Sequence, residues 1–333
     1  QPALPAPMVK DPVMPGQYLC PDATNPEAAA DKRMIKCALE YGEFAPAVAA
    51  SQQPPASIKV VAYNMERGLK LDAQIKFFKE NPDFKDADVL LLGELDRGCE
   101  RTGTRDVARD FARALGMNYV YAVEFVELAR TTPDKNERVD ATCEHGNALM
   151  SRYRILGAEQ IRFKDSVSWY IPPGPAREQG QPRIGGRIAI AADIDVNGKI
   201  IRFYTAHLES AMEVHAVREA EAKELIDHAA ATAGDMPVIM GGDFNTHLYI
   251  KGLKSDNPAD PTPRILIKNG YADAHASVSA MKRGTTRNEF GMRLVIDLIF
   301  SKGITASDRG ICPGKVCDPL SDHLPIWAKF DLK

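Results

Sequence analysis

Two kinds of apolar pattern alternate along the chain from residue 58 onward. Short, nearly continuous runs rich in β-branched and aromatic residues, such as IKVVAYN at 58–64, are typical of buried strands. Other segments place apolar residues at helical spacing. The clearest is TRDVARDFARALG at 104–116, where apolar residues recur every four positions before Gly116. Similar patterns predict helices at 72–81, ending before Pro82, and at 213–234.

Further strands are predicted where the short apolar runs recur, at 87–94, 118–125, 146–152, 187–195, 199–207, 236–242, 295–300 and 324–332. Two of these runs are joined by VNGK, in which the pair Asn197 and Gly198 is a strong hairpin signal. Strands outnumber helices, and hairpins are mixed with helical crossovers. The pattern therefore predicts an α/β fold in which two sheets pack together with helices on their flanks.

The first 56 residues have a different composition. Ten of the 23 prolines lie there, and an alanine-rich stretch precedes the first strand. This composition is typical of an extended, weakly structured arm, interrupted by a short predicted helix at 27–41. We therefore expect a Pro/Ala-rich N-terminal extension at 1–56 and one catalytic domain at 57–333.

Charge and hydropathy exclude some classes of protein. The chain is 44% hydrophobic and 26% charged, with a net charge of −3, so no global basic field attracts it to nucleic acid. No apolar run approaches the roughly 20 residues that a membrane-spanning helix needs. We therefore expect a soluble, monomeric enzyme without an obligate protein partner.

Six cysteines give an even count, which favours three disulfides in an exported protein. Pairing Cys20 with Cys37 would staple the N-terminal arm, and pairing Cys312 with Cys317 would close a tight loop; Cys99 and Cys143 remain. The alternative is six buried thiols in a cytosolic enzyme. Because the chain begins with Gln1, we expect processing that removed a signal peptide, and hence a secreted or periplasmic location.

Acids, amides and imidazoles lie at or beside several predicted strands. Asn64, Glu94, His207, Asp243 and Asn245 end or follow a strand, Asp297 interrupts the strand at 295–300, and Asp322 and His323 precede the last strand. Polar groups at the edge of a buried sheet are costly unless they satisfy one another or hold an ion. Carboxylate and amide oxygens suit Mg²⁺ or Mn²⁺, with Ca²⁺ as a third candidate, and nearby histidines could orient water or polarise a phosphoryl oxygen.

The motifs YNMERG, GELD, GNALMSR, TAHLES, GGDFNTH, VIDLIFS and SDHLPI occur in an order that resembles the endonuclease/exonuclease/phosphatase (DNase I-like) superfamily. The resemblance covers about 58–330. It implies a four-layer α/β sandwich, in which two mixed β-sheets pack face to face with helices outside, and catalysis that depends on a divalent metal.

The resemblance also implies a metal site. Glu94 resembles the principal metal ligand, and Asp322 a second carboxylate at the metal. Glu66 stands where some nucleases carry an aspartate, from which it could reach a second metal. In the segment before NALMSR, where relatives carry a tyrosine or a glutamate, Glu144 and His145 are the candidates, and the alternative is that neither serves.

Six residues resemble the catalytic set of the superfamily: Asn64, His207, Asp243, Asn245, Asp297 and His323. Asp243 resembles the acid that activates water. His323 resembles the imidazole that contacts a phosphoryl oxygen, with Asp297 as its orienting partner. Asn64 and Asn245 resemble amides that hold water or phosphate, and His207 resembles a general acid or phosphate contact.

Three arginines are candidates for binding substrate phosphate. Arg97 and Arg101 lie in LDRGCERTG, which resembles a pattern in bacterial members, and Arg187 lies beside Gly185 and Gly186. Trp169 belongs to SWYIPPGP, for which a membrane-dipping loop, a base-stacking platform and a loop folded over the body are the alternatives; the last is favoured.

The expected activity is a metal-dependent phosphodiesterase that hydrolyses nucleic acid or a phospholipid by in-line attack of water. One alternative is a phosphomonoesterase acting on a phosphorylated sugar, inositol or nucleotide, with arginines forming the pocket. The other is a catalytically silent binding module on the same scaffold.

Overall fold

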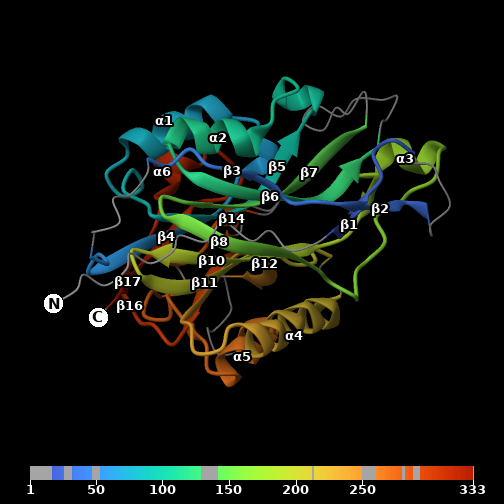
Figure 1. The fold of residues 1–333 in the computed structure, drawn as a ribbon. Coiled ribbons are helices and arrows are strands. Elements are labelled where there is room, and N and C mark those ends of the chain that lie inside the picture. Colours follow the sequence, from blue (N-terminus) through green and yellow to red (C-terminus); the bar gives the residue numbers. More distant parts are fainter. Residues whose placement is uncertain are drawn as a thin grey trace, which may run out of the picture.

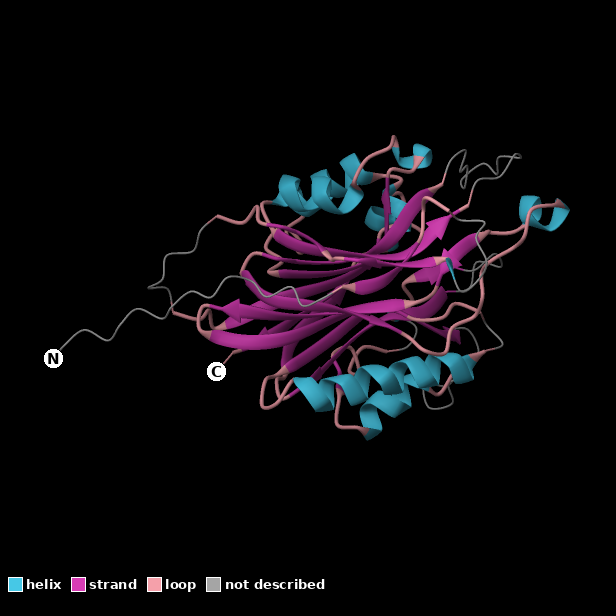
Figure 2. Ribbon diagram, turned by 45° about the vertical axis from the view of Figure 1, so that its right-hand side comes forward, coloured by secondary structure: helices cyan, strands magenta, loops and turns pink. Residues whose placement is uncertain are grey.

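The computed structural model describes residues 17–25, 32–46, 53–128, 142–211, 214–249, 260–279, 282–287 and 293–332. Two large mixed β-sheets pack face to face, and helices cover their outer faces (Figure 1). Figure 2 shows the resulting four layers, with α1 (Leu71–Glu80) and α2 (Val107–Leu115) on one side and α4 (His215–Thr232) and α5 (Thr262–Lys268) on the other. The four-layer α/β sandwich expected from the sequence is therefore confirmed.

The first sheet has the strand order β16 (Ala306–Ile311), β17 (Ile326–Asp331), β4 (Ser57–Asn64), β5 (Val89–Arg97), β7 (Cys143–Ser151), β6 (Asn118–Glu127) and β3 (Glu40–Gly42), and β9 (Arg183–Gly185) pairs with β6. The second has the order β13 (Ala272–Asp273), β15 (Arg293–Lys302), β12 (Val238–Tyr249), β11 (Lys199–His207), β10 (Ile188–Val196) and β8 (Arg154–Arg162), and β14 (Thr286–Arg287) pairs with β15. The parallel pairs β4–β5 and β11–β12 place the carboxyl ends of neighbouring strands side by side.

Alternation along the strands builds three apolar layers. In β4, Val60 and Ala62 face the other sheet, whereas Val61 and Tyr63 pack under α1 and α2. A third layer joins the outer face of the second sheet to α4 and α5. Burying each large apolar side chain contributes about 1.5–3 kcal/mol, so the two sheets are held firmly in register.

The helix and the turn that local sequence signals predict are both present in the structure. Asp106 caps α2, accepting a hydrogen bond from the Arg109 backbone N–H at 3.0 Å, and Gly116 ends this helix in the left-handed conformation. The hairpin predicted at VNGK joins β10 to β11, with Asn197 and Gly198 at φ values of 52° and 97°. Short helices occur at Glu66–Gly68 (η2), Glu100–Thr102 (η3), Pro175–Gln179 (α3) and Gly314–Cys317 (α6).

The helix predicted at 27–41 is wrong for the described part of that segment. Residues Met34–Cys37 form β2, which pairs with β1 (Tyr18–Pro21), and β3 adds to the edge of the first sheet beside β6. Pairing with a sheet edge and the Cys20–Cys37 disulfide fix an extended chain, so these tertiary contacts override a weak helical pattern. Residues 27–31 lie outside the described residues.

All six cysteines form disulfides, pairing Cys20 with Cys37, Cys99 with Cys143 and Cys312 with Cys317. The pairings expected from the sequence are therefore confirmed. Disulfides form and persist in oxidising compartments, so the structure is adapted to such an environment. Among the described helices, each is too short or too polar to cross a membrane.

Candidate active site

Strand pairing places the predicted site residues in two adjacent rows. In the second sheet, His207 on β11, Asp243 on β12 and Asp297 on β15 are direct register partners across three neighbouring strands. In the first sheet, Asn64 at the end of β4 is paired with Gly93, next to Glu94 on β5. The two rows meet where the sheets face each other, so residues far apart in sequence share one edge of the sandwich.

Asn64 links the two rows. Its side-chain amide donates to Glu94 Oε1 at 3.1 Å and to Asp243 Oδ2 at 3.2 Å. Both Asn64 and Asp243 are buried. The structure therefore joins Glu94, Asn64 and Asp243 through one amide group, as expected if all three serve one centre.

His323 is held by Asp297. The His323 Nδ1–H donates to Asp297 Oδ2 at 2.8 Å, which leaves Nε2 3.8 Å from Asp243 Oδ2. Burial alone would lower the pKa of His323, but Asp297 and Asp322 raise it well above its usual value. The segment is anchored by Ser321, whose hydroxyl donates to the Asn64 carbonyl at 2.8 Å and accepts from the His323 backbone N–H at 3.1 Å.

His207 is held in the same way by a residue that the sequence analysis missed. Its Nδ1–H donates to Glu124 Oε2 at 3.2 Å, and its Nε2 lies 3.8 Å from Asp243 Oδ2. Burial would raise the pKa of Glu124, but His207 and Arg187 lower it to about 2. An acid inside the apolar strand YVYAVEFVE was the available signal, because an unpaired carboxylate there would be costly.

Glu144 and His145 differ in where they lie. Glu144 forms an ion pair with Arg97, whereas His145 is buried and contacts Asp96. The carboxylate that contacts His207 is Glu124, and a role for Glu144 or His145 in the site stays a prediction.

The donor set suits a hard divalent cation. Glu94 and Asp243 supply carboxylate oxygens around the Asn64 amide, and Asp243, Asp297 and His323 offer ligand atoms that lie within 4.8 Å of one another. Asp297 Oδ1 is buried and has no hydrogen-bond partner among the described residues. Burial would raise the pKa of Glu94, but the field of Arg67 and three histidines holds it well below its usual value, so this carboxylate is ionised.

The other two predicted metal ligands lie together beside Glu94. The Asp322 backbone N–H donates to Glu66 Oε2 at 3.2 Å, and the Asp322 side chain is 57% exposed. Burial, followed by the charge of Asp322, raises the pKa of Glu66. A bound cation would relieve the repulsion between the Glu66 and Asp322 carboxylates, which is consistent with their expected role as metal ligands.

Three site residues have left-handed backbone conformations. The φ values are 47° at Glu66, 56° at Glu94 and 48° at Asn245. Such conformations cost on the order of 1–3 kcal/mol for residues other than glycine and gather at functional sites. Glu94 adopts its conformation within a bulge between β5 and β7, at the register shift between Leu92 and Leu95.

Gly242 is required for the approach of β12 to β11. Its φ is 134°, and a Cβ there would lie 2.1 Å from the backbone carbonyl oxygen of Ala206. We expect Gly242→Ala to lower the free energy of unfolding by about 3 kcal/mol or more, measured by chemical denaturation. Gly234→Ala, with a positive φ of 56° but open space around its Cβ, is the matched control and should cost about 1 kcal/mol. Equal effects of the two substitutions would contradict the crowding argument.

The three candidate arginines are all bonded to carboxylates. Arg97 pairs with Glu40 and Glu144. Arg101 pairs with Asp96 at 2.6 Å and with Glu127 at 3.4 Å.

Arg187 pairs with Glu124 at 2.8 Å, and its guanidinium lies 2.9 Å from His207 Nε2. Arg187 therefore lies directly beside the histidine and carboxylate cluster. Binding of substrate by these three arginines stays a prediction.

The SWYIPPGP loop lies against the body through Trp169. The Trp169 indole N–H donates to Glu209 at 3.4 Å, and its ring lies beside the guanidinium groups of Arg183 and Arg187, whose Cζ atoms are 5.3 and 5.6 Å from the ring centroid. The loop is thereby tied to the same arginine that contacts His207.

A buried acid on α4 predicts a pH dependence of stability. Glu221 Oε2 accepts from the Glu209 backbone N–H at 2.8 Å, and burial raises the pKa of Glu221 to about 8 from 4.5. Between pH 4.5 and 8 the folded state keeps a proton that the unfolded state has lost, so stability falls as pH rises through this window.

Glu221→Gln should remove that slope. We expect thermal unfolding at pH 8 to move to a higher temperature in the variant, with little change near pH 4.5, where Glu221 is already neutral in both states. Glu219→Gln on the same helix serves as the control. A variant whose unfolding temperature keeps the wild-type dependence on pH would contradict the protonated state of Glu221.

The fold and the site together define the class of protein: an α/β sandwich whose site combines hard oxygen ligands with histidines held by carboxylates. Comparison with known proteins agrees with this class. The sequence profile of the Endonuclease/Exonuclease/phosphatase family matches residues 61–323. The chain belongs to this family. A search of curated proteins found no match.

Solved structures share the fold at low sequence identity. An endonuclease/exonuclease/phosphatase family protein from Leptotrichia buccalis is 17% identical with a TM-score of 0.56, covering 83% of this chain and 100% of its own. The corresponding protein from Beutenbergia cavernae is 16% identical with a TM-score of 0.55, covering 84% of this chain and 72% of its own. The human Nocturnin catalytic domain with bound sulfate is 15% identical with a TM-score of 0.57, covering 88% and 97%.

Proposed function

We propose that the protein is a divalent-metal-dependent phosphodiesterase acting outside the cytosol, in a secreted or periplasmic location. The observation that carries this proposal is the surroundings of Asp243 Oδ2. This oxygen lies 3.8 Å from the Nε2 atoms of both His207 and His323, and 3.2 Å from the Asn64 amide that also binds Glu94. The arrangement suits metal-assisted attack of water on phosphorus.

Mg²⁺ or Mn²⁺, with Ca²⁺ as a third candidate, would be held by Glu94 with Glu66 and Asp322, and when bound it supplies positive charge that stabilises the phosphoryl group in the transition state. Asp243 orients the attacking water and accepts its proton. Burial, followed by the charge of Asp297, raises the pKa of Asp243, which makes this carboxylate a stronger base.

The histidines and Asn245 contact the substrate around this centre. The His323 Nε2–H donates to a phosphoryl oxygen, and Asp297 stabilises the charged ring. His207, oriented by Glu124 and Arg187, contacts the phosphate on the side of the leaving oxygen, which takes its proton from solvent. The Asn245 amide donates to the Leu208 carbonyl at 2.9 Å, which fixes the side chain and directs its second N–H to the phosphoryl group.

The charge balance of the arginines favours a diester over a monoester. A phosphomonoester dianion needs a concentrated cationic pocket. Arg97, Arg101, Arg183 and Arg187 are the residues that could form one, and each is bonded to at least one carboxylate. A singly charged diester needs less compensation. The alternative of a catalytically silent binding module has less support, because every acid, amide and imidazole expected in the catalytic set is present in the chain.

Parallel assays test the proposal. Purified protein with Mg²⁺, Mn²⁺ or Ca²⁺ is incubated with plasmid DNA, sphingomyelin, bis-p-nitrophenyl phosphate and p-nitrophenyl phosphate. We expect cleavage of bis-p-nitrophenyl phosphate and its loss with EDTA. Cleavage of plasmid DNA or of sphingomyelin then distinguishes a nuclease from a phospholipid hydrolase. Hydrolysis of p-nitrophenyl phosphate alone would exclude the diesterase.

A further inference from the structure

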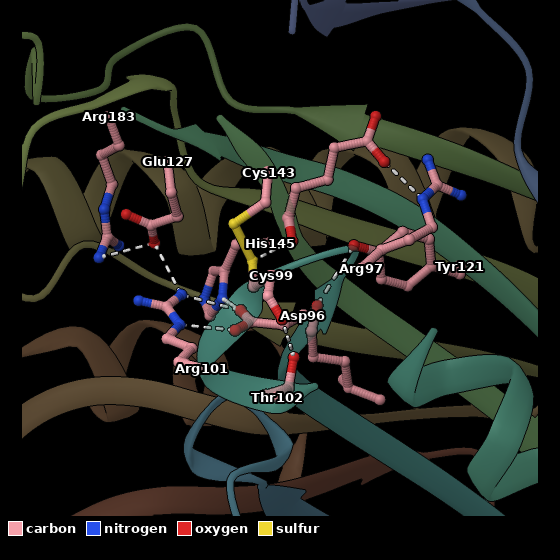
Figure 3. The surroundings of a disulfide bond; sticks show 12 residues. Asp96, Arg97, Cys99, Arg101, Thr102, Tyr121, Glu127, Cys143, His145 and Arg183 are labelled. Atoms are coloured by element: carbon pink, nitrogen blue, oxygen red, sulfur yellow. Dashed lines mark hydrogen bonds and ion pairs between the residues drawn. A yellow bond between two sulfur atoms is a disulfide. The ribbon is translucent and has the colours of Figure 1, made fainter. Parts of the chain in front are cut away.

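A buried ionic cluster adjoins Glu94, and no step proposed above uses it. It consists of Asp96, Arg101, Glu127, His145 and Arg183, here called the Asp96 cluster (Figure 3). Asp96 accepts from Arg101 Nε at 2.6 Å and Nη2 at 2.9 Å, and Glu127 joins Arg101 to Arg183. Asp96 is 0% exposed and His145 is 1% exposed. Burying this many charges has a desolvation cost, so these ion pairs are weak evidence for a gain in stability.

The cluster fixes the orientation of the His145 ring. A carboxylate can only accept, so the His145 Nδ1–H donates to Asp96 Oδ1 at 2.9 Å. Nε2 is then on the far side of the ring, where it is buried and has no hydrogen-bond partner in the described part of the chain. An unsatisfied buried polar atom costs about 1–3 kcal/mol. Two other histidines, His207 and His323, are held by carboxylates in the same manner, and both lie in the active site.

His145 lies where the bulge carrying Glu94 closes. Leu92 pairs with Ala148 and Leu95 with Gly146, so Gly93 and Glu94 together oppose a single residue of β7. The next pair beyond the bulge is Asp96 with His145. Only the pair Leu95 and Gly146 therefore separates His145 from the bulge that carries Glu94.

A disulfide secures the same ends of the two strands. Cys99 follows β5 and Cys143 begins β7, and their bond lies beside the Asp96 cluster in Figure 3. The covalent bond and the ionic cluster therefore restrict any separation of β5 from β7 next to the bulge.

We propose that His145 is a positioning residue for Glu94: held by Asp96 and Arg101, it fixes the Glu94 carboxylate through Nε2 and one bridging water in the orientation that binds the divalent cation. Histidine–carboxylate pairs of this kind support metal ligands without touching the metal. The inference rests on the proposed function, because Glu94 is taken as the metal ligand. It also gives Arg101 a role that needs no contact with substrate.

Calorimetric titration of the full chain with Mg²⁺ tests this role without turnover. His145→Phe, which keeps the ring volume but has no polar atom, should weaken Mg²⁺ binding by about 10- to 100-fold. The kcat for bis-p-nitrophenyl phosphate should fall with it at saturating Mg²⁺, whereas KM for the diester should stay within about twofold. His145→Gln, whose terminal amide supplies one donor group and one acceptor, should recover part of the Mg²⁺ affinity.

His275→Phe is the matched control. His275 is also buried, at 2% exposure, but its ring lies beside Gly310 on β16, and its variant should bind Mg²⁺ like the wild type. A folded His145→Phe variant with wild-type Mg²⁺ affinity would overturn the inference. So would equal losses in His145→Phe, His145→Gln and His275→Phe, because these would report a general loss of stability.

If His145→Phe does not fold, Asp96→Asn replaces it in the titration, because Asp96 Oδ1 holds the His145 ring through Nδ1. Weaker Mg²⁺ binding by this folded variant supports the positioning role, and unchanged binding overturns it. If the wild-type protein binds Mg²⁺ but cleaves no phosphodiester, the proposed function is wrong, and calorimetry still decides the role of His145. Wild-type protein that binds no divalent cation would remove both.

Discussion

Asp243→Asn is expected to lower kcat for a phosphodiester by about 10²- to 10⁴-fold. The substitution is isosteric, so the side chain can still accept from the Asn245 backbone N–H, as Asp243 Oδ1 does at 2.9 Å. It removes the base that accepts the proton of the attacking water. Steady-state kinetics with bis-p-nitrophenyl phosphate measure the effect, and KM should change little.

The same variant should have a stability close to that of the wild type. Burial and the neighbouring Asp297 raise the pKa of Asp243, so a neutral amide relieves an unfavourable negative charge, but its NH2 group replaces the Oδ2 atom that accepts from the Asn64 amide. Asp193→Asn, which loses an ion pair with Arg202 on β11, is the control for removal of an acid elsewhere in the second sheet. Retained turnover in Asp243→Asn, or an equal loss in Asp193→Asn, would show that the site has been assigned wrongly.

Glu94→Gln is expected to weaken Mg²⁺ binding by more than about 100-fold. Substituting a residue that only supports a metal ligand already lowers metal affinity by about 10- to 100-fold, and loss of the ligand itself should cost more. The amide keeps one oxygen to accept from Asn64, which donates to Glu94 Oε1 at 3.1 Å, but it lacks the negative charge that a hard cation requires. Calorimetric titration measures the loss directly.

Thermal unfolding gives a second measurement of the same prediction. Mg²⁺ at about 100 times its dissociation constant should stabilise the wild type by about 2.7 kcal/mol and leave Glu94→Gln unchanged. Glu159→Gln is a control, because Glu159 lies on β8 and contacts His228 on α4. If Mg²⁺ raises the unfolding temperature of Glu94→Gln as much as that of the wild type, the cation binds elsewhere.

The sequence predicted most of the fold because its strongest signals are local. The Asn197–Gly198 turn and the four-residue apolar spacing that ends at Gly116 each specify an element without reference to the rest of the chain. The segment 27–41 failed for the opposite reason. Its strands depend on a disulfide partner and on the edge of β6, and neither partner can be identified from the local pattern.

The candidate site was predictable where a polar residue follows or interrupts an apolar strand within a motif. Asp243 follows one strand and Asp297 interrupts another, and strand register makes them direct partners. Glu124 was missed because nothing in its own strand indicates that His207, 83 residues away, lies against it. Arg101 shows the reverse difficulty, since its motif suggests contact with phosphate but its guanidinium is bonded to Asp96 and Glu127.

The Asn64 amide bonds to Glu94 in its own sheet and to Asp243 in the other, so neither half of the sandwich contains a complete centre. Catalysis therefore depends on docking of the two halves, one of the last events expected in folding this topology. During refolding, recovery of phosphodiesterase activity should lag behind recovery of secondary structure, and a fragment containing the first sheet alone should be inactive because it lacks Asp243.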